Sequence, residues 1–449
     1  MATSTLPASA YEALELPSET VRILTNPKPR PNSPASTASP NLLQNVSDTE
    51  QQLSLNESSI ILYAELLLHI RTVTLYASLR TYHTRETKAQ LSSNDTCITV
   101  THEGISATIR LPIKVDGGGD AALSLPAQPP SKDLTLRLQI EEREGTDLLG
   151  GTNAEARKVN LVPWDGASLR CMESVEIACK NCHAVVVTGG KISGWRDLPS
   201  ENWAEMMDFW HCHKPDEHHL HDHTHETSVG QKGYAAGNRL NATEGVGFVD
   251  LASVLLKEQD CEGAQVSNEP SQVASLVCKQ CKHPIGTPDE SSEGWRIWKW
   301  SIGVNSASMS LSASTTYSTQ KWISARLLFL IENQGVRKFH VYPDIPKDAT
   351  STPSLLLWVF TPDLLFSSSV LSDERRDPTR SIKVFYQSQT FSPPKPGEPE
   401  SASIEDVPFP PSLFEELKRA LSDSQTLLPS TARKFQGWNV GLLERFDFA

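Results

Sequence analysis

The stretch Cys179-Lys180-Asn181-Cys182 and its counterpart Cys278-Lys279-Gln280-Cys281 decide the fold of this chain. Each places two thiols three positions apart, a spacing at which both sulfurs of a tight turn can reach one tetrahedral ion. An apolar run typical of a strand precedes each stretch. These two stretches, called the knuckles below, predict one shared structural zinc site, a Zn²⁺ ion bound by Cys179, Cys182, Cys278 and Cys281.

The long separation of the knuckles leaves an alternative open. Residues 183–277 lie between them, whereas zinc ribbons usually leave about 15–20 residues. Two unrelated turns with buried thiols are therefore the competing interpretation. If the four thiolates do share an ion, they form a closed site that contributes folding energy and has no open coordination position. We then expect a structural metal that holds a large insertion at its base.

Composition and charge limit the classes of protein to consider. The 449 residues are enough for two or three domains. The net charge of −13 argues against direct nucleic-acid binding as the main function, because phosphates attract basic patches. No apolar run approaches about 18 residues and no secretory leader is evident, so we expect no membrane association. Eight cysteines, half of them in the knuckles, suit an intracellular protein.

The order of strand and helix patterns predicts a β-rich α+β protein. Residues 1–57 are rich in Ser, Pro and Asn, and we expect a disordered tail there. Residues 58–165 show the alternation of antiparallel strands and predict a β-rich domain, sandwich- or barrel-like. Residues 166–300 form a zinc-ribbon-like centre, the zinc-knuckle region with its long inserted loop. Residues 301–449 predict a C-terminal α+β domain.

Two helices are expected in the C-terminal domain. The first runs from about Ser318 to Asn333 and ends at Gly335, a residue that favours the left-handed conformation of a helix end. The second is predicted to begin with a capping box made by Ser412 and Glu415.

The insertion contains a second candidate site, His211-Cys212-His213, on the last turn of a helix expected to begin at Ser200. A neighbouring imidazolium would stabilise the Cys212 thiolate and make it reactive. The negative end of the helix dipole opposes that effect. The alternatives are an idle cysteine beside surface histidines and a ligand set for a metal ion. For the histidines of 218–225, a solvated loop is favoured over a metal site.

Several motifs within residues 58–449 are similar to one family. They are the run 104–112, both knuckles, the run 198–203 with Trp210 and Cys212-His213, and the C-terminal run 427–445. The family is the HECT-like ubiquitin-protein ligases that bind a ubiquitin-conjugating enzyme. The resemblance implies that the protein accepts ubiquitin from a charged conjugating enzyme and passes it to a substrate or to itself. It also implies a place in the cytoplasm and nucleus, and a link to the endonuclease of pre-mRNA 3′-end processing.

One feature of the sequence departs from the HECT mechanism. A HECT ligase forms a thioester on a cysteine near its C-terminus, because a thiolate is both a good nucleophile and a good leaving group. No cysteine follows Cys281, so that thioester cannot form here.

Two hypotheses follow. As a ligase, the protein uses another thiol, with Cys212 the first candidate and Cys97, Cys171 and Cys261 weaker ones, or it only positions a charged conjugating enzyme. As a non-catalytic adaptor, it stabilises the 3′-end-processing nuclease, and its acidic balance suits a basic partner surface.

Overall fold

The computed structural model describes residues 60–67, 72–115, 122–123, 130–140, 162–198, 240–267, 274–306, 314–345, 352–370, 372, 375–391 and 403–447. They belong to one compact unit, Ser58–Ala449. The predictions for residues 1–57, for the helix from Ser200 and for the histidines of 218–225 fall outside the described residues. Among the helices that are described, none combines the length and the apolar character needed to cross a bilayer.

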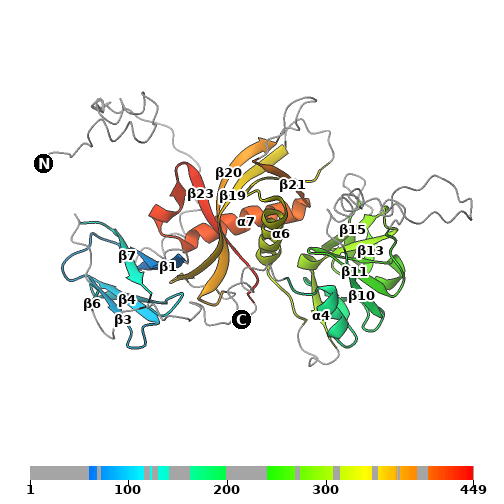
Figure 1. Cartoon of the computed structure of the whole chain (residues 1–449), viewed down its shortest axis with the longest axis horizontal. Helices are drawn as coiled ribbons and strands as arrows, with labels where there is room; N and C mark the ends of the chain where they lie inside the picture. The colour runs from blue at the N-terminus through cyan, green and yellow to red at the C-terminus, as the bar shows by residue number, and fades with distance from the viewer. Residues whose placement is uncertain are drawn as a thin grey trace, which may run out of the picture. The chain divides into compact units, whose positions relative to one another are not determined.

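The largest sheet joins strands from both ends of this unit (Figure 1). β1 pairs with β19 in antiparallel register, with Tyr63 opposite Ser368. Strands of the regions 58–165 and 301–449 therefore share one sheet, while the predicted domain limits stay predictions. Its strand order is β22 (Lys434–Phe435), β23 (Trp438–Glu444), β20 (Thr379–Phe391), β19 (Thr352–Ser368), β1 (Ile61–Leu67), β2 (Thr72–Ser78) and β7 (Asp133–Gln139), and β18 (Lys338–Pro343) pairs with β19 and with β21 (Glu405–Phe409).

Two helices pack against the β18–β23 part of this sheet, α6 (Thr319–Gln334) and α7 (Pro411–Ser424). The predicted end of α6 is confirmed, because Gly335 has φ of +71° and its N–H donates to the Ile331 carbonyl oxygen. The predicted capping box of α7 is wrong, since no side chain caps this helix. Pro411 starts the helix one residue before Ser412, because a proline with fixed φ and no N–H suits the first helical position.

A smaller antiparallel sheet covers β1, β2 and β7. It runs in the order β5 (Ile105–Arg110), β4 (Cys97–His102), β3 (Lys88–Leu91) and β6 (Ala122–Leu123). Leu62 and Leu75 of the large sheet and Ile98 and Val100 of the small one lie in the same fully buried core. This packing fits the sandwich-like arrangement expected from the alternating sequence.

The centre of the chain forms two further sheets. One has the order β10 (Gly194–Asp197), β11 (Val246–Val249), β12 (Ser253–Leu256), β16 (Gly294–Trp298), β15 (Pro284–Asp289), β14 (Leu276–Cys278) and β13 (Ala264–Val266). The other has the order β17 (Ile302–Asn305), β8 (Glu176–Cys179) and β9 (Val185–Val187). The short helices are α4 (Gly166–Cys171) and the 3₁₀ turns η2 (Glu258–Asp260), η3 (Lys299–Ser301), η4 (Gln425–Leu427) and η5 (Ser430–Ala432). The β-rich character predicted from the sequence is confirmed.

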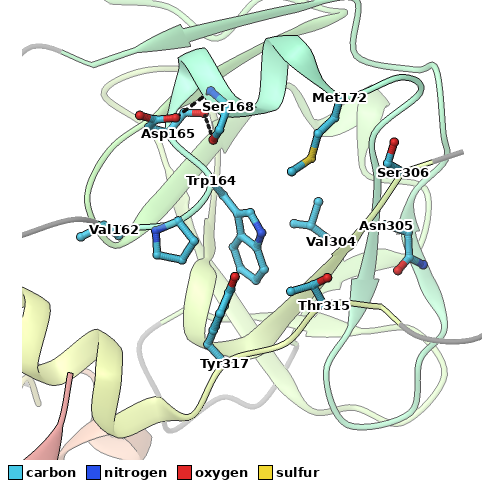
Figure 2. Close-up of a pocket in the computed structure, with 11 residues that line it drawn as sticks. Val162, Trp164, Asp165, Ser168, Met172, Val304, Asn305, Ser306, Thr315 and Tyr317 are labelled. Carbon is cyan, nitrogen blue, oxygen red and sulfur yellow. Dashed lines mark hydrogen bonds between the residues drawn. The ribbon is translucent and has the colours of Figure 1, made fainter. Parts of the chain in front are cut away.

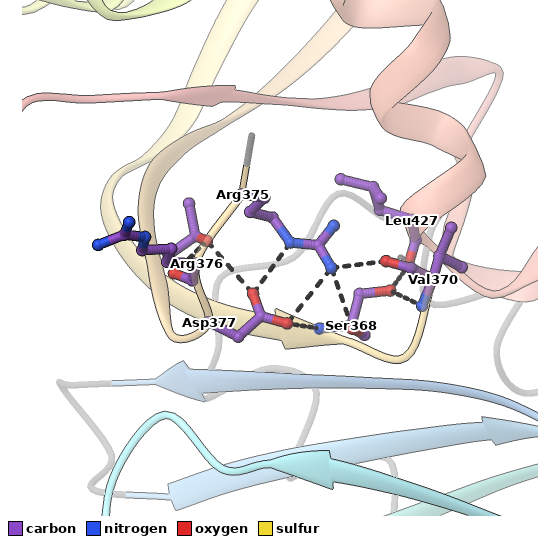
Figure 3. A network of polar contacts seen from close by, with 7 residues as sticks. Ser368, Val370, Arg375, Arg376, Asp377 and Leu427 are labelled. Carbon is purple, nitrogen blue, oxygen red and sulfur yellow. Dashed lines mark hydrogen bonds and ion pairs between the residues drawn. The ribbon is translucent and has the colours of Figure 1, made fainter. Parts of the chain in front are cut away.

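Arg375, which lies shortly before β20, makes hydrogen bonds to the end of β19 and to Asp377 (Figure 3). The Nε atom of Arg375 donates to Asp377 Oδ1 at 3.0 Å, and its Nη2 atom donates to the carbonyl oxygens of Ser368 and Val370. Ser368 Oγ in turn donates to the Leu427 carbonyl oxygen at 3.0 Å. The start of the C-terminal run is thereby fixed against the end of β19.

A buried ion pair joins β1 to β20, the two strands on either side of β19 in the large sheet. Glu65 of β1 is only 4% exposed, and its carboxylate accepts hydrogen bonds from Tyr63 Oη at 2.9 Å and from Lys383 Nζ of β20. Burial, with the nearby Glu65 charge, raises the pKa of Tyr63 well above its usual value. The carboxylate therefore depends on Lys383 for its compensating charge.

Replacing Lys383 by methionine should destabilise the protein strongly. The Glu65 carboxylate would stay buried without a cation, which costs about 3–5 kcal/mol. Urea unfolding of Lys383→Met would measure this loss. The double variant Glu65→Gln/Lys383→Met removes both charges and should recover a large part of it. Equal losses in the single and double variants would contradict this account.

Candidate metal centre

The four knuckle cysteines lie together although residues 183–277 separate the knuckles along the chain. Their sulfur atoms all lie within 4.8 Å of one another. The Cys179 and Cys281 sulfurs are 3.7 Å apart, as are those of Cys182 and Cys278. Both of these distances join one knuckle to the other. The two half-sites thus form a single cluster, and the alternative of two separate turns is wrong.

The sulfur–sulfur distances fit a metal ion and exclude disulfides. A disulfide would bring two sulfurs to about 2.05 Å. Four thiolates at about 2.3 Å from a tetrahedral zinc would lie about 3.8 Å from one another. A set of four sulfur donors also suits zinc or iron rather than magnesium or calcium. The cluster could therefore hold one metal ion with no coordination position left for a substrate.

The two knuckles have matching backbone conformations. The N–H of Cys179 donates to the Ala184 carbonyl oxygen at 2.8 Å, and that of Cys278 donates to the His283 carbonyl oxygen at 3.0 Å. The residue after the second cysteine has φ of +60° in both turns. That residue is His183 in the first knuckle and Lys282 in the second. The same Cys-x-x-Cys spacing therefore produces the same turn twice.

A glycine connects β9, the strand that follows the first knuckle, to the second knuckle through the backbone. The N–H of Gly263 donates to the Val186 carbonyl oxygen at 3.0 Å, and its carbonyl oxygen accepts from the Lys279 N–H at 2.9 Å. A Cβ atom on residue 263 would lie 2.0 Å from the Val185 carbonyl oxygen, so only glycine fits this close approach. Gly263 could not be predicted from the sequence, because nothing distinguishes it locally from the glycine of an ordinary turn.

The environments of the thiols differ across the cluster. Burial raises the pKa of Cys179 to about 12 and also raises the pKa of Cys182. Burial acts in the same direction on Cys281, but hydrogen bonds from the Asn181 side chain and the His283 N–H lower its pKa to about 6. A cation is thus needed before all the sulfurs can ionise near neutral pH. Asn181 hydrogen-bonds Cys281, as the groups around a metal site do with its ligands, and its place between two cysteines was the available signal.

The remaining cysteines stand apart from the cluster. The site predicted at His211-Cys212-His213 lies outside the described residues, so a reactive Cys212 stays a prediction. Cys261 is 2% exposed, and burial, with the nearby charges of Asp260 and Glu258, raises its pKa to about 12, which does not suit a nucleophile. Cys97, half-buried in β4, and the exposed Cys171 in α4 are the other free thiols of the described chain.

Fold and site together define a β-rich protein organised around a four-cysteine centre. A sequence model of the HECT-like ubiquitin-conjugating enzyme (E2)-binding family matches residues 65–440, and the chain belongs to this family. The resemblance noted in the motifs is therefore confirmed.

Several curated proteins are similar to this chain at low identity. An uncharacterised protein of Schizosaccharomyces pombe is 28% identical over 293 residues, covering 64% of this chain and 78% of that protein. An uncharacterised protein of Saccharomyces cerevisiae is 22% identical, covering 69% and 86%. A human protein named as an E3 ubiquitin-protein ligase is 23% identical, covering 69% and 80%. No solved structure matches the chain.

Purified protein should contain one equivalent of metal, and Cys278→Ala should lose most of it. The affinity should fall as the pH falls, because protons compete with the metal for the thiolates. Elemental analysis of protein dialysed at several pH values would measure both effects. Cys171→Ala, which removes a thiol outside the cluster, is the matched control. A content below about half an equivalent in undenatured protein would contradict the metal site.

Proposed function

We propose that this chain binds a ubiquitin-conjugating enzyme and promotes the transfer of ubiquitin from it to a substrate or to the chain itself. The family match over residues 65–440 is the observation that carries the proposal. The similarity of the chain to human and mouse proteins named as E3 ubiquitin-protein ligases supports the same role.

The positions of the cysteines favour a transfer of ubiquitin that forms no thioester on this chain. Four thiols are gathered in the cluster, Cys261 is buried, and no cysteine follows Cys281. A ligase of this kind accelerates transfer by holding the charged conjugating enzyme and the acceptor amine together. The amine then attacks the thioester of the conjugating enzyme itself. Cys212 remains the candidate nucleophile of the covalent alternative.

The metal in this proposal is Zn²⁺ with a structural role. Four sulfur donors at tetrahedral spacing support zinc, and the cluster joins β8 of one sheet to β14 of another. In this role the ion stabilises the folded centre and takes no part in ubiquitin transfer.

A discharge assay tests the proposed route. We expect the chain to accelerate the loss of ubiquitin from a charged conjugating enzyme to free lysine, and Cys212→Ser to keep the full rate. Non-reducing gels should show no ubiquitin thioester on the chain. Cys278→Ala, which disrupts the cluster, should lose the activity together with the binding of the conjugating enzyme. A thiol-sensitive ubiquitin adduct that Cys212→Ser abolishes would show the covalent route instead.

A second candidate function is that of a non-catalytic adaptor of the pre-mRNA 3′-end-processing endonuclease, acting in the nucleus and cytoplasm. The absence of a cysteine beyond Cys281 and the net charge of −13 favour it, since an acidic surface complements a basic partner. Affinity purification from cells followed by mass spectrometry separates the two functions. Recovery of such a nuclease without any ubiquitin-conjugating enzyme would favour the adaptor.

A further inference from the structure

The cysteine cluster contains two buried and two accessible residues. Cys179 and Cys278, which end β8 and β14, are 0% exposed. Cys182 and Cys281 lie in the turns after these strands, are partly exposed, and have their sulfurs near the surface. One contact of 3.7 Å joins the sulfurs of Cys179 and Cys281, and the other joins those of Cys182 and Cys278. Each contact across the knuckles therefore pairs one accessible cysteine with one buried cysteine.

A cleft of about 370 Å³ lies beside the two knuckles. Its walls include Asn181 and His283, whose side-chain amide and main-chain N–H hydrogen-bond the Cys281 sulfur. The cavity beside α4 (Figure 2) is not a comparable route, because its lining, which includes Trp164 and Met172, contains no cysteine. A small molecule from solvent therefore reaches the cluster at the turns of the knuckles, where the accessible cysteines lie.

The sulfurs of a metal-bound cluster have the form that peroxides attack. A cysteine must be deprotonated to bind a metal, and the thiolate is the reactive form of the side chain. A peroxide converts an accessible thiolate to a sulfenic acid, which condenses with a neighbouring thiolate to a disulfide. In each pair the buried sulfur at 3.7 Å would have to move only about 1.7 Å closer to reach the length of an S–S bond.

We propose that the cluster is a peroxide-responsive centre in which Cys281 forms a disulfide with Cys179 and Cys182 forms one with Cys278. For each pair, the O–O bond of one hydrogen peroxide breaks and one S–S bond forms. The two thiolates give up two electrons, and the peroxide takes them up with two protons and becomes two molecules of water. When both pairs have reacted, the ion has lost its four thiolate ligands and leaves the site.

Disulfides across the knuckles would take over the structural role of the ion. They join cysteines 102 and 96 positions apart, so they connect β8 to β14 and restrict the unfolded chain over a long loop. Disulfides within each Cys-x-x-Cys turn would leave the two strands unconnected. The oxidised protein therefore keeps its fold without the ion, and reduction restores the metal site. This response depends on the cluster alone and not on the proposed ligase function.

Mass spectrometry of tryptic peptides tests the pairing. The zinc-loaded full chain is treated with hydrogen peroxide, the released zinc is measured with a chromogenic chelator, and the remaining thiols are blocked. Trypsin cleaves after Lys180 and Lys279, so each cysteine of the cluster lies on its own peptide and every pairing can be distinguished. We expect one zinc ion released for every two disulfides, and both disulfides should join one knuckle to the other.

A sulfenic-acid trap tests which sulfurs react first. After a short exposure to peroxide in the presence of dimedone, the label should lie on Cys182 or Cys281 and not on the buried Cys179 or Cys278. Cys171→Ala, which removes an exposed thiol outside the cluster, is the matched control and should leave the release of zinc unchanged. A first label on the buried pair would contradict the order of steps.

Urea unfolding tests the structural consequence. The oxidised, zinc-free protein should unfold at a higher urea concentration than reduced protein from which a chelator has removed the zinc, because only the oxidised form keeps a link between the knuckles. A thiol reductant followed by zinc should restore one equivalent of bound metal.

Three results would overturn the inference. They are disulfides within the knuckles, retention of zinc at a peroxide concentration that oxidises Cys171, and an oxidised protein no more stable than the reduced, stripped one. Protein that binds no zinc would contradict the metal centre and this inference together. The discharge of ubiquitin from a conjugating enzyme is a separate measurement, and its failure would leave the peroxide response in place.

Discussion

Four sulfur atoms within 4.8 Å of one another are the constraint on which the centre of this protein depends. Thiolates at this distance repel one another, and neutral thiols hydrogen-bond only weakly, so the arrangement calls for a cation among them. The sulfurs come from the ends of β8 and β14 and from the turns that follow these strands, which belong to different sheets. Gly263 adds a backbone connection between β9, the neighbour of β8, and the second knuckle. The cluster thus determines how the two central sheets meet.

A closed four-sulfur centre with a bound ion would stabilise the protein without taking part in the transfer of ubiquitin. Since all four positions of an ion would be filled by the knuckles, no substrate could bind to it. In the proposed function the reactive thioester belongs to the conjugating enzyme, so this chain needs binding surfaces more than a nucleophile.

Features with a short-range cause could be predicted from the sequence. The knuckles depend on a three-residue spacing and α6 on the glycine that follows it, and both are found in the structure. The start of α7 was missed because Pro411 outweighs a capping pattern one residue later. Pairing of β1 with β19 and of β8 with β17 brings together segments more than a hundred residues apart. No local pattern encodes such contacts, since many pairings satisfy the same alternation.

The pairing of β1 with β19 has a consequence for the way the chain is made. At about 5–20 residues per second, Ser368 leaves the ribosome roughly 15–60 s after its partner Tyr63. Until then the apolar edge of β1 has no neighbour on that side and is open to wrong pairing or to chaperones. The nascent chain cannot complete its largest sheet before β19 has been synthesised. This sheet is therefore completed late in synthesis, and until then the free edge of β1 needs protection from wrong pairing.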